Sequence, residues 1–241
     1  MTDPSPSPRP RPARRPPGFF GQVALVAGKD LAIELSTGEI VTTSGFFAVL
    51  VAVIASLAFF AGQKATQEVA PGVIWVAVAF ASVLAVGRTW QREREDNALA
   101  GLLVMPVSRG AIFAGKAISV AIFVTLVELI VIPVAALLFA VDLVETGPGL
   151  LLLALLATPG IAAVGTLFGA MTVRTRARDL VLASVFFPLL APSLLAAVAG
   201  TRTLFGGAPT AELFDYLMLM GVFGVVFTAA GVGMFDLLIE A

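Results

Sequence analysis

Six apolar runs of membrane-spanning length recur along this sequence and limit the folds it can adopt. A helix needs about 20 mostly apolar residues to cross a hydrocarbon core of roughly 30 Å. Apolar residues make up 59% of the 241 residues and charged residues 13%, unlike a water-soluble domain. Short alternating segments typical of a barrel are absent, and helices satisfy their own backbone in lipid. The sequence therefore predicts an all-α integral membrane protein with spans near residues 43–61, 71–87, 111–140, 150–173, 180–199 and 214–236.

The basic residues are divided unequally between the two sides of such a bundle. Lys and Arg near span ends are retained on the cytoplasmic side. With the N-terminus inside, all but two of the 15 basic residues face the cytoplasm, the exceptions being Lys64 and Arg202. We therefore expect both termini in the cytoplasm. The net charge of −1 averages over this asymmetry and indicates no nucleic-acid partner.

Two segments precede the first span. Residues 1–17 are rich in Pro and Arg and poor in apolar side chains, which predicts a disordered cytoplasmic tail. Residues 18–42 mix apolar side chains with lysine and acidic residues and are too polar to cross the membrane. They predict an amphipathic elbow helix lying in the interface; a cytoplasmic helix packed on the bundle has the same periodicity. Residues 43–241 then form the six-helix transmembrane domain.

A charged island, Arg88–Asn97, lies between the second and third expected spans. Charges of both signs followed by leucines at helical spacing predict a short amphipathic helix at the membrane surface. Such a coupling helix can insert into a cleft of an ATPase and pass its movement to the spans. We expect rim contacts from Arg92, Glu93, Arg94, Glu95, Asp96 and Asn97 and a buried face of Leu99, Leu102 and Leu103. A solvated loop with mutual ion pairs is the alternative interpretation.

One acidic residue, Glu128, falls inside the third expected span. A carboxyl group in hydrocarbon is costly unless it is neutral, paired or wetted, and its sequence neighbours offer no cation. One interpretation is functional: Glu128 lines a path, contacts another subunit or relays a proton. The other is a neutral carboxyl that hydrogen-bonds a carbonyl of a neighbouring helix.

The later expected spans contain several glycines and prolines. Pro133, Pro159, Pro188 and Pro192 are expected to interrupt otherwise straight helices, either as static packing features or as hinges. The spacing of Gly165 and Gly169 predicts a close approach of two helices.

Missing residue types exclude several functions. The chain has no Cys and no His, which excludes disulfides, thiol redox chemistry, the usual zinc sites and the commonest axial ligand of haem iron. Gly110–Lys116 has the glycine and lysine spacing of a phosphate-binding loop. However, Ala117 replaces the magnesium-binding Ser or Thr and no strand precedes the segment. We therefore expect no catalysis, metal or cofactor binding by this chain, and energy must come from a partner.

Several motifs, in their order along the six spans, resemble the CcmB family, the permease subunit of the haem exporter of cytochrome c biogenesis. The motifs are Lys29–Glu34, Ala70–Trp75, Arg92–Asp96, Gly101–Pro106, Gly110–Lys116, Thr158–Gly160 and Pro188–Pro192. The resemblance covers nearly everything but the tail.

This resemblance implies a subunit of an ABC transporter in a bacterial inner or plasma membrane. Its partners would be a separate ATPase, in two copies, that binds the ATP, and a membrane subunit that handles the haem; a second copy of this chain is also consistent with the family. The ATP-driven step would export haem or release a haem-loaded chaperone. Two alternatives stay open: an ABC permease for another hydrophobic substrate, and a proton-coupled secondary transporter that uses Glu128.

Overall fold

Helices make up almost all of the described part of the chain. The computed structural model describes residues 17–59, 63–95, 101, 104–172 and 178–240, and within these ranges it contains no strand. The helices are α1 (Phe19–Thr37), α2 (Glu39–Ala58), α3 (Gln63–Glu95), α5 (Arg109–Phe139), α6 (Leu143–Thr172), α7 (Arg178–Phe205), the short 3₁₀ helix η1 (Thr210–Leu213) and α8 (Phe214–Glu240). Almost all of the expected tail, residues 1–17, lies outside the described residues.

Six helices are long and apolar enough to cross a membrane, which confirms the predicted fold class. Their spanning segments are Glu39–Ala58, Gln67–Arg94, Arg109–Phe139, Leu143–Met171, Ser184–Phe205 and Thr210–Asp236. Several extend beyond the apolar runs seen in the sequence, because helices continue into polar residues that find partners inside the protein. The helices also continue through Pro133, Pro159, Pro188 and Pro192.

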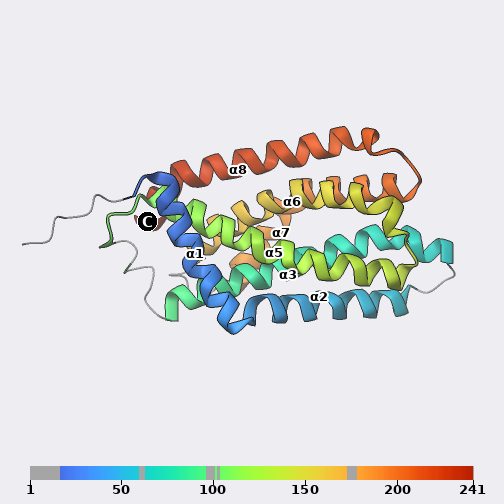
Figure 1. Cartoon of the computed structure of the whole chain (residues 1–241), viewed down its shortest axis with the longest axis horizontal. Helices are drawn as coiled ribbons and strands as arrows, with labels where there is room; N and C mark the ends of the chain where they lie inside the picture. The colour runs from blue at the N-terminus through green and yellow to red at the C-terminus, as the bar shows by residue number, and fades with distance from the viewer. Residues whose placement is uncertain (1–16, 60–62, 96–100, 102–103, 173–177, 241) are drawn as a thin grey trace, which may run out of the picture.

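The spanning helices form an elongated bundle, and α1 runs steeply across one end of it (Figure 1). The C-terminal ends of α3 and α8 and the N-terminal end of α5 lie at this same end. There Arg109 at the start of α5 pairs with Asp236 near the end of α8, with 3.3 Å between Nε and Oδ1. The charged residues of α1, of the end of α3, of the start of α5 and of the end of α8 are thus gathered at one end of the molecule.

The turn between α1 and α2 is made by a single glycine. Gly38 has φ 62° and ψ 10°, a left-handed conformation that a side chain disfavours. Its amide donates to the carbonyl oxygen of Glu34 at 2.6 Å, which closes α1. The first span therefore begins at Glu39, whereas the sequence pattern placed the boundary at residue 42.

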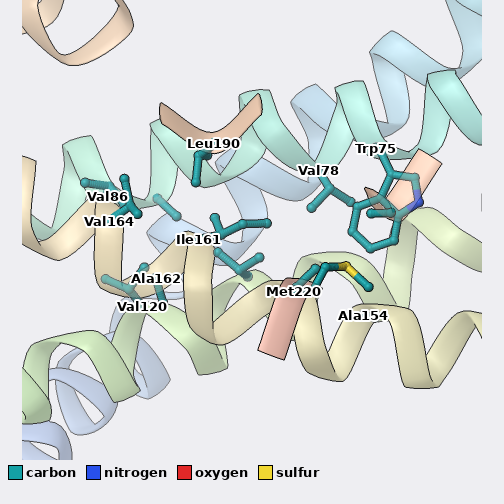
Figure 2. Packing of buried hydrophobic residues seen from close by; sticks show 14 of the residues in the cluster. Trp75, Val78, Val86, Val120, Ala154, Ile161, Ala162, Val164, Leu190 and Met220 are labelled. Atoms are coloured by element: carbon teal, nitrogen blue, oxygen red, sulfur yellow. The ribbon is translucent and has the colours of Figure 1, made fainter. Parts of the chain in front are cut away.

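An apolar core runs along the bundle and is packed tightly enough to require small residues. Figure 2 shows part of it, from Val86 at one end to Trp75 at the other. A Cβ on Gly165 would lie 2.4 Å from Val86, and one on Gly169 would lie 2.2 Å from the ring of Trp90. Both neighbours belong to α3, so the predicted close approach is confirmed as contact between α6 and α3.

Candidate functional site

A buried ionic cluster connects α1, α3 and α5 at the charged end of the bundle. We call it the lysine cluster, and its members are Lys29, Asp30, Glu93 and Lys116. Lys116 donates to Asp30, with an Nζ to Oδ1 distance of 3.0 Å, and also to Glu93. Lys29 donates to the same oxygen of Glu93 at 2.5 Å. Residues that lie 64 and 86 positions apart in the sequence are therefore held at one point.

The cluster is stable only as a set because most of it is removed from solvent. Lys116 is 1% exposed and Glu93 is 3% exposed. Taking one charge out of water costs several kcal/mol unless an opposite charge and hydrogen bonds replace the lost hydration. Here two ammonium groups face two carboxylates, and the ring of Trp90 lies 5.9 Å from Lys116 Nζ. Each charge depends on a partner from another helix.

Lys29 is the most exposed member of the lysine cluster and keeps its charge over a wide pH range. Burial by itself lowers the pKa of Lys29. The hydrogen bond to Glu93 and the negative charge of Asp30 outweigh burial, so the pKa of Lys29 lies above its ordinary value. The ammonium is therefore the form present at physiological pH.

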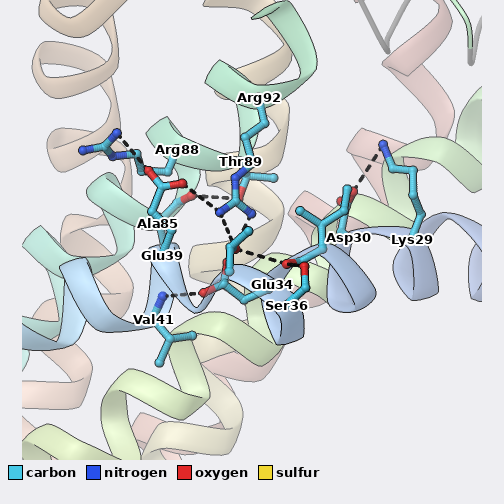
Figure 3. Close-up of polar contacts among 12 residues, drawn as sticks. Lys29, Asp30, Glu34, Ser36, Glu39, Val41, Ala85, Arg88, Thr89 and Arg92 are labelled. Atoms are coloured by element: carbon cyan, nitrogen blue, oxygen red, sulfur yellow. Dashed lines mark hydrogen bonds and ion pairs between the residues drawn. The ribbon is translucent and has the colours of Figure 1, made fainter. Parts of the chain in front are cut away.

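A second set of ion pairs, the arginine cluster, lies beside the first and consists of Glu34, Glu39, Arg88 and Arg92 (Figure 3). Arg92 reaches both acids, with 3.1 Å from Nη1 to Glu34 Oε2 and 3.1 Å from Nη2 to Glu39 Oε2. Arg88 contacts Glu39 at 3.2 Å. Glu34 also accepts from the backbone N–H of Val41 at 2.9 Å, near the start of α2 where free amides favour an anion. The cluster thus joins α1 and α2 to α3.

Close packing of α1 on α5 brings these charges within reach. A Cβ on Gly115 would lie 2.6 Å from Val26 of α1, and a Cβ on Gly110 would lie 3.0 Å from the carbonyl oxygen of Val232 in α8.

The glycine and lysine spacing of Gly110–Lys116 therefore serves helix packing and a buried ion pair. The segment is helical from Arg109 onward and capped by Ser108, so it does not form a phosphate-binding loop.

The exposed side of α1 is apolar. Its buried residues include Val23, Val26, Asp30 and Glu34, while the large side chains of Phe20, Leu25 and Leu35 face outward. The two acidic side chains of α1 thus face the interior of the bundle. An interfacial location of α1 stays a prediction.

The structure describes only some of the residues predicted to form the coupling helix. Arg94 is exposed, as a rim contact requires. Glu93 differs from that expectation, because its carboxylate is buried and bonded to two lysines of this chain. Arg92 is likewise engaged by Glu34 and Glu39. Asp96, Asn97, Leu99, Leu102 and Leu103, and the side chain of Glu95, lie outside the described residues, so the coupling helix stays a prediction.

Glu128 lies in a different setting, between α5 and α6. Its side chain is buried, and its partner is the hydroxyl of Thr158 on α6, which lies 2.9 Å from Oε1 and 2.8 Å from Oε2. Within the described residues Glu128 forms no ion pair. The carboxyl therefore bonds a neighbouring helix, as one interpretation of the sequence held, but through a hydroxyl rather than a carbonyl.

The sequence pattern did not reveal that Lys29, Asp30 and Lys116 meet in one cluster, or that Glu34 pairs with Arg92 in the other. Two signals were present: Asp30 and Glu34 stand one helical turn apart, and Lys116 follows a glycine inside an otherwise apolar run. Neither signal names the partner. As for metals, the described residues contain no group of three or more His, Cys, Asp or Glu side chains close enough to share an ion.

Comparison with known proteins gives a consistent result along the chain. Residues 22–234 match the family model described as CcmB protein. Heme exporter protein B of Pseudomonas aeruginosa is 27% identical over 165 residues, covering 68% of this chain and 73% of that protein. Heme exporter protein B of Bradyrhizobium diazoefficiens is 26% identical over 179 residues, covering 74% and 80%. That of Haemophilus influenzae is 26% identical over 184 residues, covering 74% and 83%.

The matched region contains both ionic clusters and nearly all of the six candidate spans. The resemblance drawn from separate motifs is thereby confirmed over most of the sequence, and the chain belongs to the CcmB family.

Proposed function

We propose that this protein is the membrane subunit of a haem exporter of cytochrome c biogenesis, located in a bacterial inner membrane with both termini in the cytoplasm. The support is its family membership, its similarity to proteins named heme exporter protein B, and six helices suited to cross a bilayer. The gathering of α1, the end of α3 and the end of α8 at one end of the bundle (Figure 1) agrees with an even number of spans.

In this proposal ATP is bound and hydrolysed by partner subunits, and the protein converts their movement into rearrangement of its spans. The observation that carries the proposal is the attachment of the end of α3. Arg92 and Glu93, the first two residues of the expected coupling segment, are bonded to α1, α2 and α5. A push on residues 92–103 would act on a junction of four helices rather than on one flexible end.

The cargo is proposed to be handled mainly by another membrane subunit. A sequence without His or Cys offers neither of the strongest protein ligands of haem iron. The ATP-driven step then moves haem along a path shared with that subunit, or releases a haem-loaded chaperone from it.

Co-purification is the first test of the proposal. The tagged protein, extracted in mild detergent, should bring down an ATP-binding cassette ATPase and a haem-binding membrane protein. Recovery of an ATPase without the haem-binding subunit would instead favour an ABC permease for another hydrophobic substrate. If no ATPase is recovered and Glu128→Gln also abolishes transport, a proton-coupled transporter is favoured.

Coupling is tested by replacing Glu95 and Asp96 together with alanine. We expect normal membrane levels of the variant but loss of mature cytochrome c, because the push no longer reaches the spans. The matched control is Glu212→Ala with Asp215→Ala, two exposed acids in η1 and the first turn of α8; α8 starts at the end of the bundle opposite α1 (Figure 1). Wild-type cytochrome c levels in the Glu95 and Asp96 variant would overturn the coupling role.

A further inference from the structure

Two pockets follow one another along the seam between α3 and α7, and the proposed coupling role uses neither. The charged pocket has a volume of about 540 Å³, and its lining includes Glu68 and Arg202. The apolar pocket has a volume of about 270 Å³. Their linings are one helical turn apart on both helices, with Pro71 and Arg202 in the charged pocket and Trp75 and Val198 in the apolar pocket.

The charged pocket lies toward the end of the bundle opposite α1, where α3 begins (Figure 1). A buried hydrogen bond fixes the seam where the two pockets adjoin, because Trp75 Nε1 donates to Thr201 Oγ1 at 2.8 Å. Both of these side chains are almost fully buried. The walls are thus held in place by the protein itself, which lowers the cost of ordering them around a ligand.

The apolar pocket is open on the flank of the bundle. Of its lining residues, Phe80 is 42% exposed and Leu195 is 68% exposed. The ring of Phe80 packs on that of Phe187, with 4.9 Å between the centroids. These residues belong to segments suited to span a bilayer, where exposed apolar side chains face hydrocarbon. The apolar pocket therefore suits a hydrocarbon chain that enters from the lipid.

The charged pocket offers one anion and one cation to a ligand. Glu68 and Arg202 are both exposed, and among the described residues neither side chain has an ion-pair partner. They lie in the first turn of the candidate span Gln67–Arg94 and the last turn of Ser184–Phe205, which is the depth of lipid headgroups. With both termini in the cytoplasm, as proposed, these headgroups belong to the outer leaflet.

We propose that the two pockets together bind phosphatidylethanolamine, a phospholipid whose headgroup carries a phosphate and a primary ammonium. The phosphate accepts from the guanidinium of Arg202, the ammonium donates to Glu68, and one acyl chain lies in the apolar pocket. A phosphatidylglycerol headgroup leaves Glu68 without a cation, and the trimethylammonium of phosphatidylcholine has no N–H to donate. A soluble zwitterion leaves the apolar pocket empty, so the arrangement favours a lipid.

The test is native mass spectrometry of the whole protein, purified in detergent and titrated with the three phospholipids carrying identical acyl chains. We expect phosphatidylethanolamine to bind about tenfold more tightly than phosphatidylglycerol and about threefold more tightly than phosphatidylcholine. Soluble glycerophosphoethanolamine at equal concentration should not displace the lipid. Equal affinities for the three lipids, or displacement by the soluble headgroup, would overturn the assignment.

Substitutions of exposed side chains separate the parts of the site. Glu68→Met should abolish the preference for phosphatidylethanolamine over phosphatidylcholine, whereas Arg202→Met should weaken all three lipids because each has the phosphate. Leu195→Trp, which fills the apolar pocket, should also weaken all three. The matched control is Glu212→Met, an exposed acid in η1 that lines neither pocket. If this control changed lipid selectivity as Glu68→Met does, general surface charge would explain the binding and the proposed site would be wrong.

Discussion

The lysine cluster and Glu128 are two solutions to the same problem, a carboxyl group inside a membrane protein. Glu93 is 3% exposed and Glu128 is 2% exposed, so neither keeps its hydration. Glu93 is matched by the ammonium groups of Lys29 and Lys116, whereas Glu128 is matched by one neutral hydroxyl. The first group remains charged and joins three helices. The second is tolerable only as a neutral acid and joins two.

The difference teaches where this bundle can hold charge. At the end covered by α1, several polar side chains converge, and each charge can be balanced by another helix. Along the flank of α5 and α6 the surroundings are mainly apolar, and the hydrogen-bond partner of Glu128 is one hydroxyl, that of Thr158. Loss of a partner should therefore have much larger consequences at the charged end than at Glu128.

The largest effect is expected for Lys116→Met. This change removes the ammonium that serves both Asp30 and Glu93 and leaves buried carboxylates short of a cation, which should cost about 3–5 kcal/mol of stability. Unfolding in detergent can be followed by the fluorescence of Trp75 and Trp90, both buried. Adding Glu93→Gln to this variant should recover part of the lost stability. If Lys116→Met alone were as stable as wild type, the contrast between the charged end and Glu128 would be wrong.

A smaller loss is expected for Thr158→Val. The variant keeps the shape of the side chain but removes the hydroxyl from Glu128, so a neutral buried acid loses its partner at a cost of about 1–3 kcal/mol. The same unfolding assay measures it. Thr158→Ser, which retains the hydroxyl, should stay closer to wild type. A loss as large as that of Lys116→Met would mean that Glu128 is charged, contrary to the comparison.

Arg88→Ala should have a minor effect of about 0–1 kcal/mol. Arg88 and Glu39 have 42% and 47% of their side chains exposed, so water replaces most of what their ion pair contributes. Arg92→Ala is the informative companion, because Arg92 also serves buried Glu34. Equal losses in the two variants would show that burial does not set the strength of these pairs.

The smallest effect concerns pH and Lys29. Its raised pKa means that its stabilising contribution is fully present below the ordinary value of 10.5 and is lost as the pH rises through the higher folded-state pKa. The difference in unfolding midpoint between wild type and Lys29→Met should therefore be constant from neutral pH to about pH 10 and shrink above it. A difference that changes near neutral pH would contradict the shift.

The sequence predicted the fold class better than the site. Six spans were readable because each is a contiguous apolar run. The boundary between the elbow and the first span, expected at residue 42, lies at Gly38 instead, where a left-handed backbone conformation ends α1. In the charged island, composition could not distinguish Arg94, which is exposed, from Glu93, which is buried. Both are charged residues in one polar stretch, and only their orientation on α3 separates them.

The sequence by itself determined the number and approximate positions of the membrane helices, because bilayer thickness acts on consecutive residues and leaves a local signal. It also determined that the chain has neither His nor Cys with which to bind haem iron. Only the tertiary structure decided which charges meet. The partners of Glu93 come from α1 and α5, and a contact between distant segments depends on how glycines such as Gly115 let the helices approach.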